Sequence, residues 1–192
     1  MRIRVTLSLI LGLAGLFAIG FGASGESKTR RHVTIPVVAA KPEDVSSIEA
    51  IVNADYECIS GGVGVARQWG RDLSLYDPHA WLVSVDTDPK TGTITKASFS
   101  EQEYVDRTDA RFVKDGFTEH ELGHRIYRFG NIATMLSSYE GKFASTGKVA
   151  SRGVNIYQLY FDGKRWWILS VAWNDETPGN PIPAELLPKP GA

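Results

Sequence analysis

The spacing of apolar residues predicts a helix early in the chain. Between residues 42 and 62 these residues recur at the spacing of one helical face; they are Ile48, Ile51, Val52, Tyr56 and Ile59. Pro42 suits the first turn of such a helix, and the glycines at 61 and 62 end the pattern. A second, shorter helix is expected over residues 65–75, where Trp69 and Leu73 lie.

Two strands and a third helix are expected next. Residues 80–85 (AWLVSV) alternate as a strand, and residues 94–99 (ITKASF) continue as another after a turn. Ser100 and Glu103 then fit a capping box, in which the two side chains bind each other's backbone N–H groups at a helix start. The third helix should run to about Lys114.

The last third of the chain is rich in strand residues. Residues 131–143 read as one strand, and residues 155–161 and 165–173 flank an Asp-Gly pair that favours a hairpin. Alternation in the last strand predicts two apolar faces, which indicates a strand covered on both sides. One face would hold Trp167, Leu169, Val171 and Trp173, and the other Trp166, Ile168 and Ala172. Helices followed by antiparallel strands indicate an α+β fold with helices on one face of a curved sheet.

The sequence HELGH, from His120 to His124, matches the H-E-x-x-H pattern that binds zinc on a helix. On a helix the two imidazoles would lie about 6 Å apart and could share one zinc ion. Glu121 would then be the base that activates water. Thr118 and Glu121 fit a capping box, which favours this helix.

Other observations oppose a zinc site. A catalytic zinc ion needs a third protein ligand, but Tyr127 and Gly130 stand where the extended motif has glycine and histidine. Glu140 could replace that histidine, although its surroundings read as a strand. If residues 117–129 form a strand, the two histidines stand about 13 Å apart and are too distant to bind one ion.

The first 25 residues read as an export signal. Arg2 and Arg4 form a basic head, an apolar run follows over residues 5–21, and small residues occupy 22–25, where cleavage is expected. We therefore expect an exported protein, periplasmic or secreted, with membrane contact only through this segment if it is uncleaved. Residues 26–41 are expected to form a flexible linker, residues 42–187 one domain and residues 188–192 a disordered tail.

Charge and cysteine content narrow the possible partners. Residues 1–25 hold two of the 21 basic side chains and none of the 22 acidic ones, so the rest carries a net charge of −3. This balance argues against a nucleic-acid partner, which needs a basic face. Cys58 is the single cysteine, so it has no partner for an internal disulfide. Within a helix it is expected to be a small buried residue.

Three stretches together resemble the nuclear transport factor 2-like superfamily, in its polyketide-cyclase-like and ketosteroid-isomerase-like branches. They are GFTEHELGHRIYRFGNIATMLSSYE, RGVNIYQLYFDGKRWWILSVAWNDE and NPIPAELLP. The resemblance covers nearly all of residues 42–187. It implies a cone-shaped α+β barrel, in which a strongly bent antiparallel sheet wraps over a long first helix with two shorter helices. It also implies a pocket for a small apolar ligand and a possible homodimer through the sheet.

In that scaffold residues 117–129 form a long strand. The match of His120, Glu121 and His124 to a zinc motif is then coincidental, and we expect neither a metal nor another cofactor. Which face of this strand lines the pocket stays open, because a bulge would exchange the two faces.

The resemblance leaves the function undecided, because no known catalytic dyad of the superfamily maps onto this chain. The candidate catalytic carboxylates are Asp55, Asp72, Glu119 and Glu121. The candidate aromatic pocket residues are Tyr56, Trp69, Tyr76 and Trp167. We expect a small-molecule-binding or accessory domain, with an isomerase, dehydratase or cyclase using a carboxylate base as the alternative and a zinc hydrolase as a minor one. A buried carboxyl group that faces an apolar cavity with a raised pKa would favour the enzyme.

Overall fold

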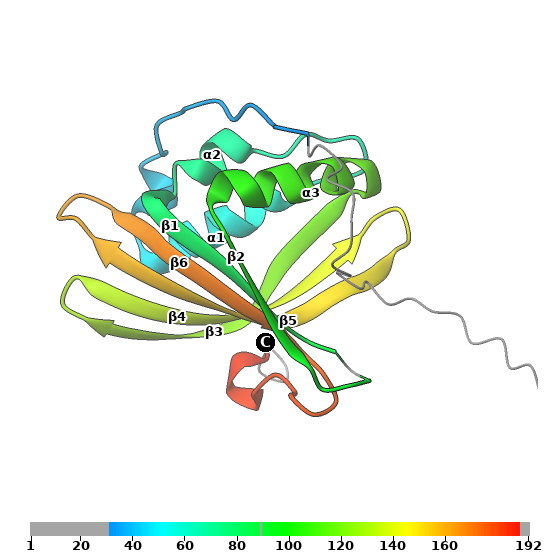
Figure 1. Cartoon of the computed structure of the whole chain (residues 1–192). Coiled ribbons are helices and arrows are strands. Elements are labelled where there is room, and N and C mark those ends of the chain that lie inside the picture. Colours follow the sequence, from blue (N-terminus) through cyan, green and yellow to red (C-terminus); the bar gives the residue numbers. More distant parts are fainter. Residues whose placement is uncertain (1–30, 89, 189–192) are drawn as a thin grey trace, which may run out of the picture.

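The protein is a bent six-stranded sheet with three α-helices packed on its concave side (Figure 1). This computed structural model describes residues 31–88 and 90–188. The strand order across the sheet is β2-β1-β6-β5-β4-β3. The helical elements are η1 (Glu43–Val45), α1 (Ile48–Ile59), α2 (Trp69–Leu73), α3 (Glu101–Asp115) and η2 (Ala184–Leu186). The strands are β1 (Tyr76–Thr87), β2 (Ile94–Phe99), β3 (Phe117–Phe129), β4 (Ile132–Phe143), β5 (Lys148–Phe161) and β6 (Trp166–Asp175).

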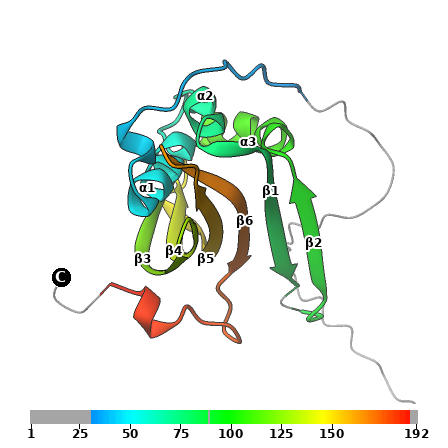
Figure 2. The ribbon, with the colours of Figure 1, turned by 90° about the vertical axis from the view of Figure 1, so that its left-hand side faces the viewer.

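The α+β fold and the bent sheet are confirmed, and the sheet is mixed. Strand β1 pairs antiparallel with β2 but parallel with β6, whereas all other neighbours are antiparallel. Figure 2 shows the sheet curling from β3 round to β1 and β2, with the helices closing one end of the curl. This curl leaves the interior of the cone between the helices and the sheet.

The first helical segment is divided into two. Pro42 precedes the short η1, and α1 begins only after Ser47, whose hydroxyl accepts a hydrogen bond from the Ala50 N–H at 3.0 Å. A serine at this position satisfies a backbone donor at the helix start, which explains why the helix restarts there. The predicted apolar face of α1 is buried, and so is Cys58.

Helix α3 begins as predicted. The Ser100 hydroxyl accepts from the Glu103 N–H, and the Glu103 carboxylate accepts from the Ser100 N–H. Gly116 ends the helix in the left-handed conformation with φ of 67°, which glycine adopts without steric cost. At 15 residues α3 is longer than α1, which has 12.

The HELGH segment lies in strand β3, so the helical alternative is wrong. Glu121 pairs with Tyr139 and Gly123 pairs with Ser138, which leaves Leu122 as an extra residue in a β-bulge. The bulge exchanges the faces of the strand. Simple alternation would place Glu121 and His124 on opposite faces, but the extra residue brings both to the interior face.

A second bulge changes the faces of β6. Leu159 pairs with Ile168 and Gln158 pairs with Ser170, which leaves Leu169 as the extra residue. The face predicted to hold Trp167 together with Val171 and Trp173 is therefore divided. Trp167 lies on the outer face, and Val171 and Trp173 belong to the interior core.

Two apolar clusters hold the helices on the sheet. The larger lies between α1 and the sheet and includes Ile51, Val52, Met135, Leu159 and Ile168, each at most 1% exposed. The smaller joins α2 and α3 to the start of β3 through Trp69, Val105, Phe112 and Phe117. Phe112 and Phe117 stack with their ring centroids 4.2 Å apart. The second cluster therefore holds α2 and α3 against the start of β3.

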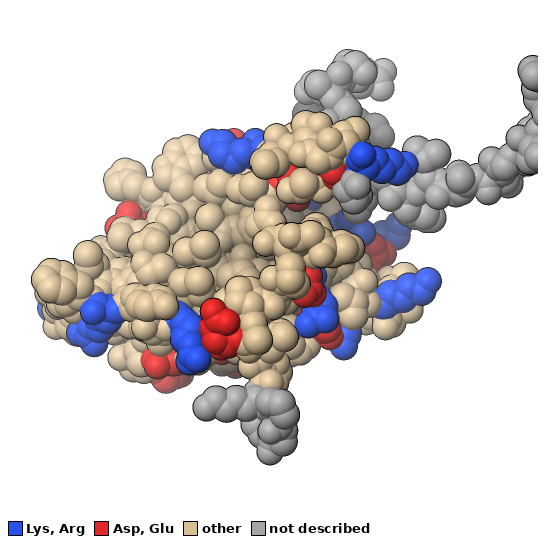
Figure 3. Space-filling view, turned by 90° about the horizontal axis from the view of Figure 1, so that it is seen from below, with Lys and Arg blue, Asp and Glu red and all other residues tan. Residues whose placement is uncertain are grey.

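The C-terminal segment, residues 180–187, crosses the outer face of the sheet. Leu186 in this segment is 2% exposed, and its backbone carbonyl accepts a hydrogen bond from the Ser138 hydroxyl. Seen from below, where this segment lies, uncharged residues make up most of the visible surface (Figure 3). Several apolar side chains of the outer face stay exposed: Trp81, Tyr127, Phe129, Ile132 and Ile156. A homodimer through this face stays a prediction.

The chain leading to the domain packs on the helices from residue 33 onward. The Val33 N–H donates to the Asp106 carboxylate at 2.9 Å, and Val33 and Ile35 pack against the smaller cluster. Part of the predicted linker therefore contacts the domain. The expected export signal lies outside the described residues. Within the residues that the structure describes, no helix combines the length and apolar character needed to cross a bilayer.

Gly123 allows the C-terminal segment to lie directly on β3. A Cβ atom at this position would lie 2.6 Å from the Leu186 carbonyl oxygen, a backbone atom. We therefore expect Gly123→Ala to lower the free energy of unfolding by about 1–3 kcal/mol, as overpacking does. Urea denaturation measures the change. Gly179→Ala is the control, because no atom lies within 4 Å of its Cβ position. Equal stability of the two variants would contradict this packing role.

Candidate functional site

A cavity of about 270 Å³ lies inside the cone, between the helices and the concave face of the sheet. Phe112 and Phe117 from the smaller apolar cluster form one wall, and Leu82 and Val171 from the sheet form another. Carboxyl groups and tyrosines line the rest, so the cavity combines apolar walls with a few polar groups. Such mixed, concave spaces are the usual form of small-molecule sites.

Asp55 on α1 is buried and lines the cavity. Its carboxylate accepts hydrogen bonds from the hydroxyls of Tyr76 at 2.6 Å and Tyr157 at 2.7 Å. Burial raises the pKa of Asp55, and the two tyrosine hydroxyls act in the opposite direction because they stabilise the anion. The same site raises the pKa of both tyrosines, mainly through burial.

Asp72 on α2 and Glu101 on α3 extend this acidic group. Hydrogen-bonding interactions link Asp72 to both Asp55 and Glu101. No N–H or O–H donor of the described residues reaches Asp72 Oδ1 or either oxygen of Glu101. These carboxyl groups can hydrogen-bond each other only if a proton is shared between them, because two carboxylates offer no donor.

Burial therefore keeps protons on this group near neutral pH. It raises the pKa of Asp72 well above its usual value, and the negative charges of Glu101 and Asp55 add to the effect. Burial also raises the pKa of Glu101 to about 7. Asp72 is 1% exposed and Glu101 is 6% exposed.

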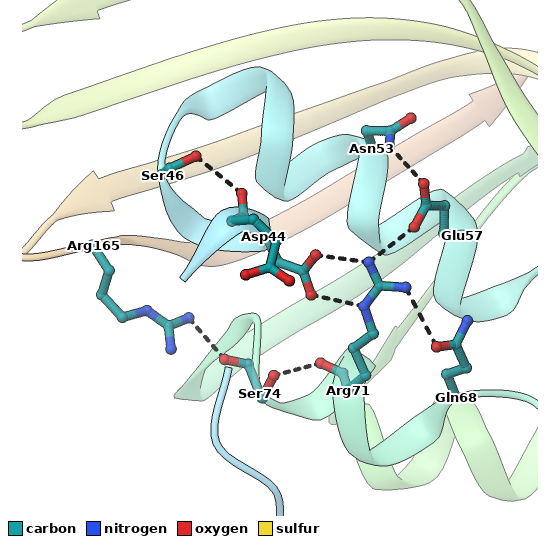
Figure 4. Close-up of polar contacts among 9 residues, drawn as sticks. Asp44, Ser46, Asn53, Glu57, Gln68, Arg71, Ser74 and Arg165 are labelled. Atoms are coloured by element: carbon teal, nitrogen blue, oxygen red, sulfur yellow. Dashed lines mark hydrogen bonds and ion pairs between the residues drawn. The ribbon is translucent and has the colours of Figure 1, made fainter. Parts of the chain in front are cut away.

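Arg71 ties the short helix α2 to the helical elements beside it (Figure 4). Its guanidinium donates two hydrogen bonds of 2.7 Å to Asp44 and one of 2.9 Å to Glu57, which joins α2 to η1 and α1. The Asp44 side chain is buried, and the hydrogen bond from Arg71 lowers the pKa of this carboxyl group. With Arg71 held on this side of the short helix, Asp72 faces the interior.

Glu119 on β3 faces the same cavity from the sheet. Burial raises its pKa to about 8, and the negative charge of Asp55 adds to this, while a hydrogen-bonding interaction with Asn155 lowers it. The side chain retains partial exposure because it faces the cavity, although protein atoms surround it. The protonated and ionised forms of Glu119 are both populated near neutral pH.

Two exposed residues of opposite charge line the cavity. Asp175 at the end of β6 is exposed and accepts a hydrogen bond of 2.6 Å from the Tyr139 hydroxyl. Arg111 on α3 lies with its guanidinium carbon 4.4 Å from the centroid of the Phe143 ring, and it pairs with Asp115 at 3.7 Å. The exposed part of the cavity lining therefore holds both a carboxylate and a guanidinium.

A chain of hydrogen bonds runs behind the cavity wall. Asn155 donates to the Tyr56 hydroxyl at 3.1 Å, and the hydroxyls of Tyr56 and Ser137 lie 2.7 Å apart. Ser137 in turn donates to Glu121 at 2.6 Å, and the other oxygen of Glu121 lies 2.6 Å from His124 Nδ1. These bonds satisfy the polar groups of the bulged strand and hold Asn155 next to Glu119.

Comparisons with known proteins identify the fold. No family model matches the chain, and no curated protein matches it. Among solved structures, the beta subunit of a proposed aromatic-ring-hydroxylating dioxygenase from Novosphingobium aromaticivorans is 14% identical, with a TM-score of 0.53. The match covers 74% of this chain and 94% of that subunit. The Bd1075 protein of Bdellovibrio bacteriovorus is 10% identical with a TM-score of 0.50, over 69% of this chain and 41% of that one.

Another matching structure is described as a nuclear transport factor 2-like protein of unknown function, from Shewanella baltica. It is 12% identical over 66% of this chain and 86% of that chain, with a TM-score of 0.41. The bent sheet wrapped over helices and the cavity inside the cone are those that the sequence resemblance implied. The likeness to the dioxygenase subunit shows a shared fold, the bent-sheet cone that the resemblance to the nuclear transport factor 2-like superfamily implied.

The nuclear transport factor 2-like cone brings some of the sequence candidates together. Asp55, Asp72, Glu119 and Tyr76 all line the cavity. Glu121 and Tyr56 belong to the chain of hydrogen bonds behind it. Trp69 packs in the smaller apolar cluster and donates its indole N–H to Asp109 at 2.7 Å. Trp167 lies on the outer face of the sheet, where it stacks with Tyr160.

Sequence reasoning missed several residues of this cavity. Asn155, Tyr157 and Trp173 reach it by alternation in β5 and β6, and Tyr104 reaches it from α3. The alternation of residues 155–161 could have grouped Asn155 with Tyr157. Glu101 could not be recognised as a site residue from the sequence. An acidic residue in the first turn of a helix normally lies in solvent and interacts with the positive end of the helix dipole.

The structure gives no support for a metal site at HELGH. His120 faces the outer side of β3, where it pairs in register with Glu140, and only Glu121 and His124 contact each other. Among the residues that the structure describes, no group of three or more histidine, cysteine, aspartate or glutamate side chains has the arrangement to hold a metal ion.

The raised pKa values of the buried carboxyl groups predict how the stability of the fold depends on pH. Their pKa values are raised in the folded state, so the folded protein binds more protons than the unfolded chain between about pH 4 and pH 8. The free energy of unfolding should therefore fall as pH rises through this range. Glu101→Gln should reduce the slope of the free energy of unfolding against pH by up to about 1.4 kcal/mol per pH unit.

Chemical denaturation at a series of pH values between 4 and 8, roughly the span of the shifts, measures this slope. Glu140→Gln is the control, because its carboxylate pairs with Lys142 at 2.7 Å and its pKa is lowered. A slope that Glu101→Gln leaves as steep as in the wild type would contradict the shared protons.

Proposed function

We propose that this protein is an exported domain that binds a small organic molecule inside the cone and exchanges a proton with it through Glu119. The observation that carries the proposal is a carboxyl group with a pKa of about 8 facing a cavity with aromatic walls. An acid–base group is most effective when its pKa lies near the working pH. Glu119 has that property, whereas an ordinary glutamate is fully ionised.

The surroundings of Glu119 suit proton transfer at carbon. Asn155, which is 7% exposed and held by Tyr56, orients the carboxyl group. Phe117 and Phe143, whose ring centroids lie 5.4 Å apart, give the same cavity apolar walls. Among the described residues the hydroxyl of Tyr104 has no hydrogen-bond partner, so it can donate to an oxygen of the ligand. These parts fit removal of a proton next to a carbonyl group, as in an isomerase or a dehydratase.

A binding or accessory role without catalysis is the second candidate. One similar structure is described as the beta subunit of a proposed ring-hydroxylating dioxygenase, and that likeness extends to the fold alone. The hydrogen bonds that Asp55 and Asp175 accept from tyrosines also fit a structural use of those carboxylates. The two candidates differ in whether Glu119 is needed for a reaction.

The proton-transfer role can be tested with 2-tetralone, a small ketone that exchanges protons next to its carbonyl group. We expect the protein to accelerate deuterium uptake in D₂O, followed by NMR, and Glu119→Gln to reduce the acceleration at least about 100-fold. Glu140→Gln, a surface carboxylate on β4, should retain the full rate.

A direct measurement complements this rate. A ¹³C NMR titration of the Glu119 carboxyl carbon should give an apparent pKa of about 8. The proposal fails if Glu119→Gln exchanges deuterium as fast as the wild type, or if Glu119 titrates near the ordinary value of about 4.3.

The proposed export is supported by the basic head, the apolar run and the small residues of positions 1–25. We expect the chain made in a Gram-negative host to be recovered from the periplasm without its first 22 to 25 residues. Intact-mass spectrometry gives the position of the cut. Leu11→Arg places a charge in the apolar run and should leave the full-length chain in the cytoplasm. Full-length wild-type chain in the cytoplasmic fraction would contradict export.

A further inference from the structure

A row of large apolar side chains crosses the outer face of the sheet at the end where the β3–β4 and β5–β6 hairpins turn. Figure 1 shows these two hairpins side by side, and their first and last strands are joined through the pairing of β4 with β5. Phe129 pairs in register with Ile132, Ile132 with Tyr160, and Tyr160 with Trp167. Residues that pair directly across neighbouring strands lie on the same face, so these four form one continuous set, which we call the hairpin row.

The hairpin row is exposed, although its side chains are large and apolar. Phe129 is 86% exposed and Ile132 58%, and the rings of Tyr160 and Trp167 stack with their centroids 6.5 Å apart. The C-terminal segment covers a different part of this face, where its Leu186 is buried. A contiguous apolar surface that the chain itself leaves uncovered marks an interaction site.

Positive charge is concentrated around this row. The two hairpin segments, residues 125–132 and 160–167, together hold four basic side chains and one acidic one. Residues 26–192 as a whole carry a net charge of −3, so the charge of this end is opposite in sign to that of the protein. The four basic residues are Arg125, Arg128, Lys164 and Arg165.

The carboxylates at this surface are already bound by neighbouring groups. Asp162 accepts hydrogen bonds from the Trp167 indole and from the Lys164 backbone N–H, each at 2.8 Å. Asp77 on β1 accepts one of 3.3 Å from the Tyr160 hydroxyl. Four basic groups against these two acidic ones leave a net charge of +2 beside the hairpin row.

Basic side chains at this surface are available to a partner. Among the described residues, no group binds the guanidinium of Arg125 or the ammonium of Lys164. The guanidinium carbon of Arg165 lies 3.6 Å from the centroid of the Trp167 ring, which places a positive charge directly on the hairpin row. The surface therefore combines exposed apolar rings with cations that no carboxylate of the described chain neutralises.

An anionic membrane surface complements both properties. Tryptophan and tyrosine rings are stable at the level of lipid headgroups, apolar side chains are stable at the boundary of the acyl chains, and lysine and arginine are attracted to anionic lipids. A second copy of this chain fits the charge less well. In a two-fold contact the same patch faces itself, so the four basic groups would meet four others of the same sign.

We propose that the hairpin row and the four basic side chains around it bind the domain peripherally to a membrane that contains anionic lipid. Phe129 and Ile132, the most exposed members of the row, enter the interface, while Arg125 and Lys164 bind headgroups. This contact needs none of residues 1–25. It also lies on the face of the sheet opposite the cavity, so it is independent of the proton transfer proposed for Glu119.

Cosedimentation with large unilamellar vesicles tests the proposal, using the chain without residues 1–25 so that the hairpin row is the surface under test. One set of vesicles is phosphatidylcholine alone, and the other is equal parts of phosphatidylcholine and phosphatidylglycerol. We expect binding to the anionic vesicles to be at least about fivefold tighter, because each basic residue near an anionic surface contributes about that factor. Raising the salt from about 0.1 M to about 1 M should weaken it, because the charges are then screened within about 3 Å.

Two variants assign the binding to its residues. Phe129→Ser removes the most exposed ring of the row and should weaken binding to the anionic vesicles at least about tenfold, because its apolar burial in the interface is lost. Val37→Ser is the matched control, since Val37 is 93% exposed and lies in the segment that packs on the helices. Lys164→Gln should weaken the same binding about fivefold, whereas Lys114→Gln at the end of α3 should leave it unchanged.

The results separate a membrane surface from a protein interface. Absence of binding to the anionic vesicles, or equal binding by the Phe129→Ser and Val37→Ser variants, overturns the proposal. Light scattering during size-exclusion chromatography shows whether the wild type is a dimer that Phe129→Ser dissociates. Such a dimer together with no vesicle binding assigns the row to a second copy of the chain and also overturns the proposal. Both substituted residues are exposed, so circular dichroism should show wild-type folding in each variant.

Discussion

The burial of carboxyl groups between the helices and the sheet is the constraint on which the site depends. A carboxylate taken out of water is stable only with a proton, a cation or several hydrogen-bond donors. Asp55 has two tyrosine hydroxyls as donors, whereas Asp72 and Glu101 are stabilised by protons that they retain and share. Arg71 joins α2, the helix that holds Asp72, to η1 and α1 through hydrogen bonds to Asp44 and Glu57.

This arrangement separates structural from chemical roles among the acidic residues. Asp44 and Glu57 accept hydrogen bonds from Arg71 and join the helices, and the pKa of Asp44 is lowered accordingly. Glu119 faces open space and has a raised pKa with only Asn155 to stabilise its anion. The difference in environment, not in residue type, is what makes Glu119 the group available for reaction with a ligand.

Much of the fold could be predicted from local patterns. The capping box at Ser100 and Glu103, the apolar face of α1 and most of the strands follow from interactions within a few residues. The site was less accessible to sequence reasoning. The candidate set included Asp55, Asp72 and Glu119, but Glu101 and Tyr104 lie on a helix whose remaining positions are largely polar. Their burial depends on packing against a sheet that is distant in sequence.

The two bulges could not be predicted from the sequence, and they decide which side chains share a face of the sheet. The residues between Phe117 and Phe129 specify a strand, but the extra residue at Leu122 decides that Glu121 and His124 share a face. The second bulge, at Leu169, places Trp167 on the outer face of the sheet and Val171 on the inner face. The sequence by itself determined the class of fold, the probable elements and the separation of the HELGH histidines along an extended chain. Only the tertiary structure decided which side chains meet in the cavity, because strand register and burial depend on contacts between distant segments.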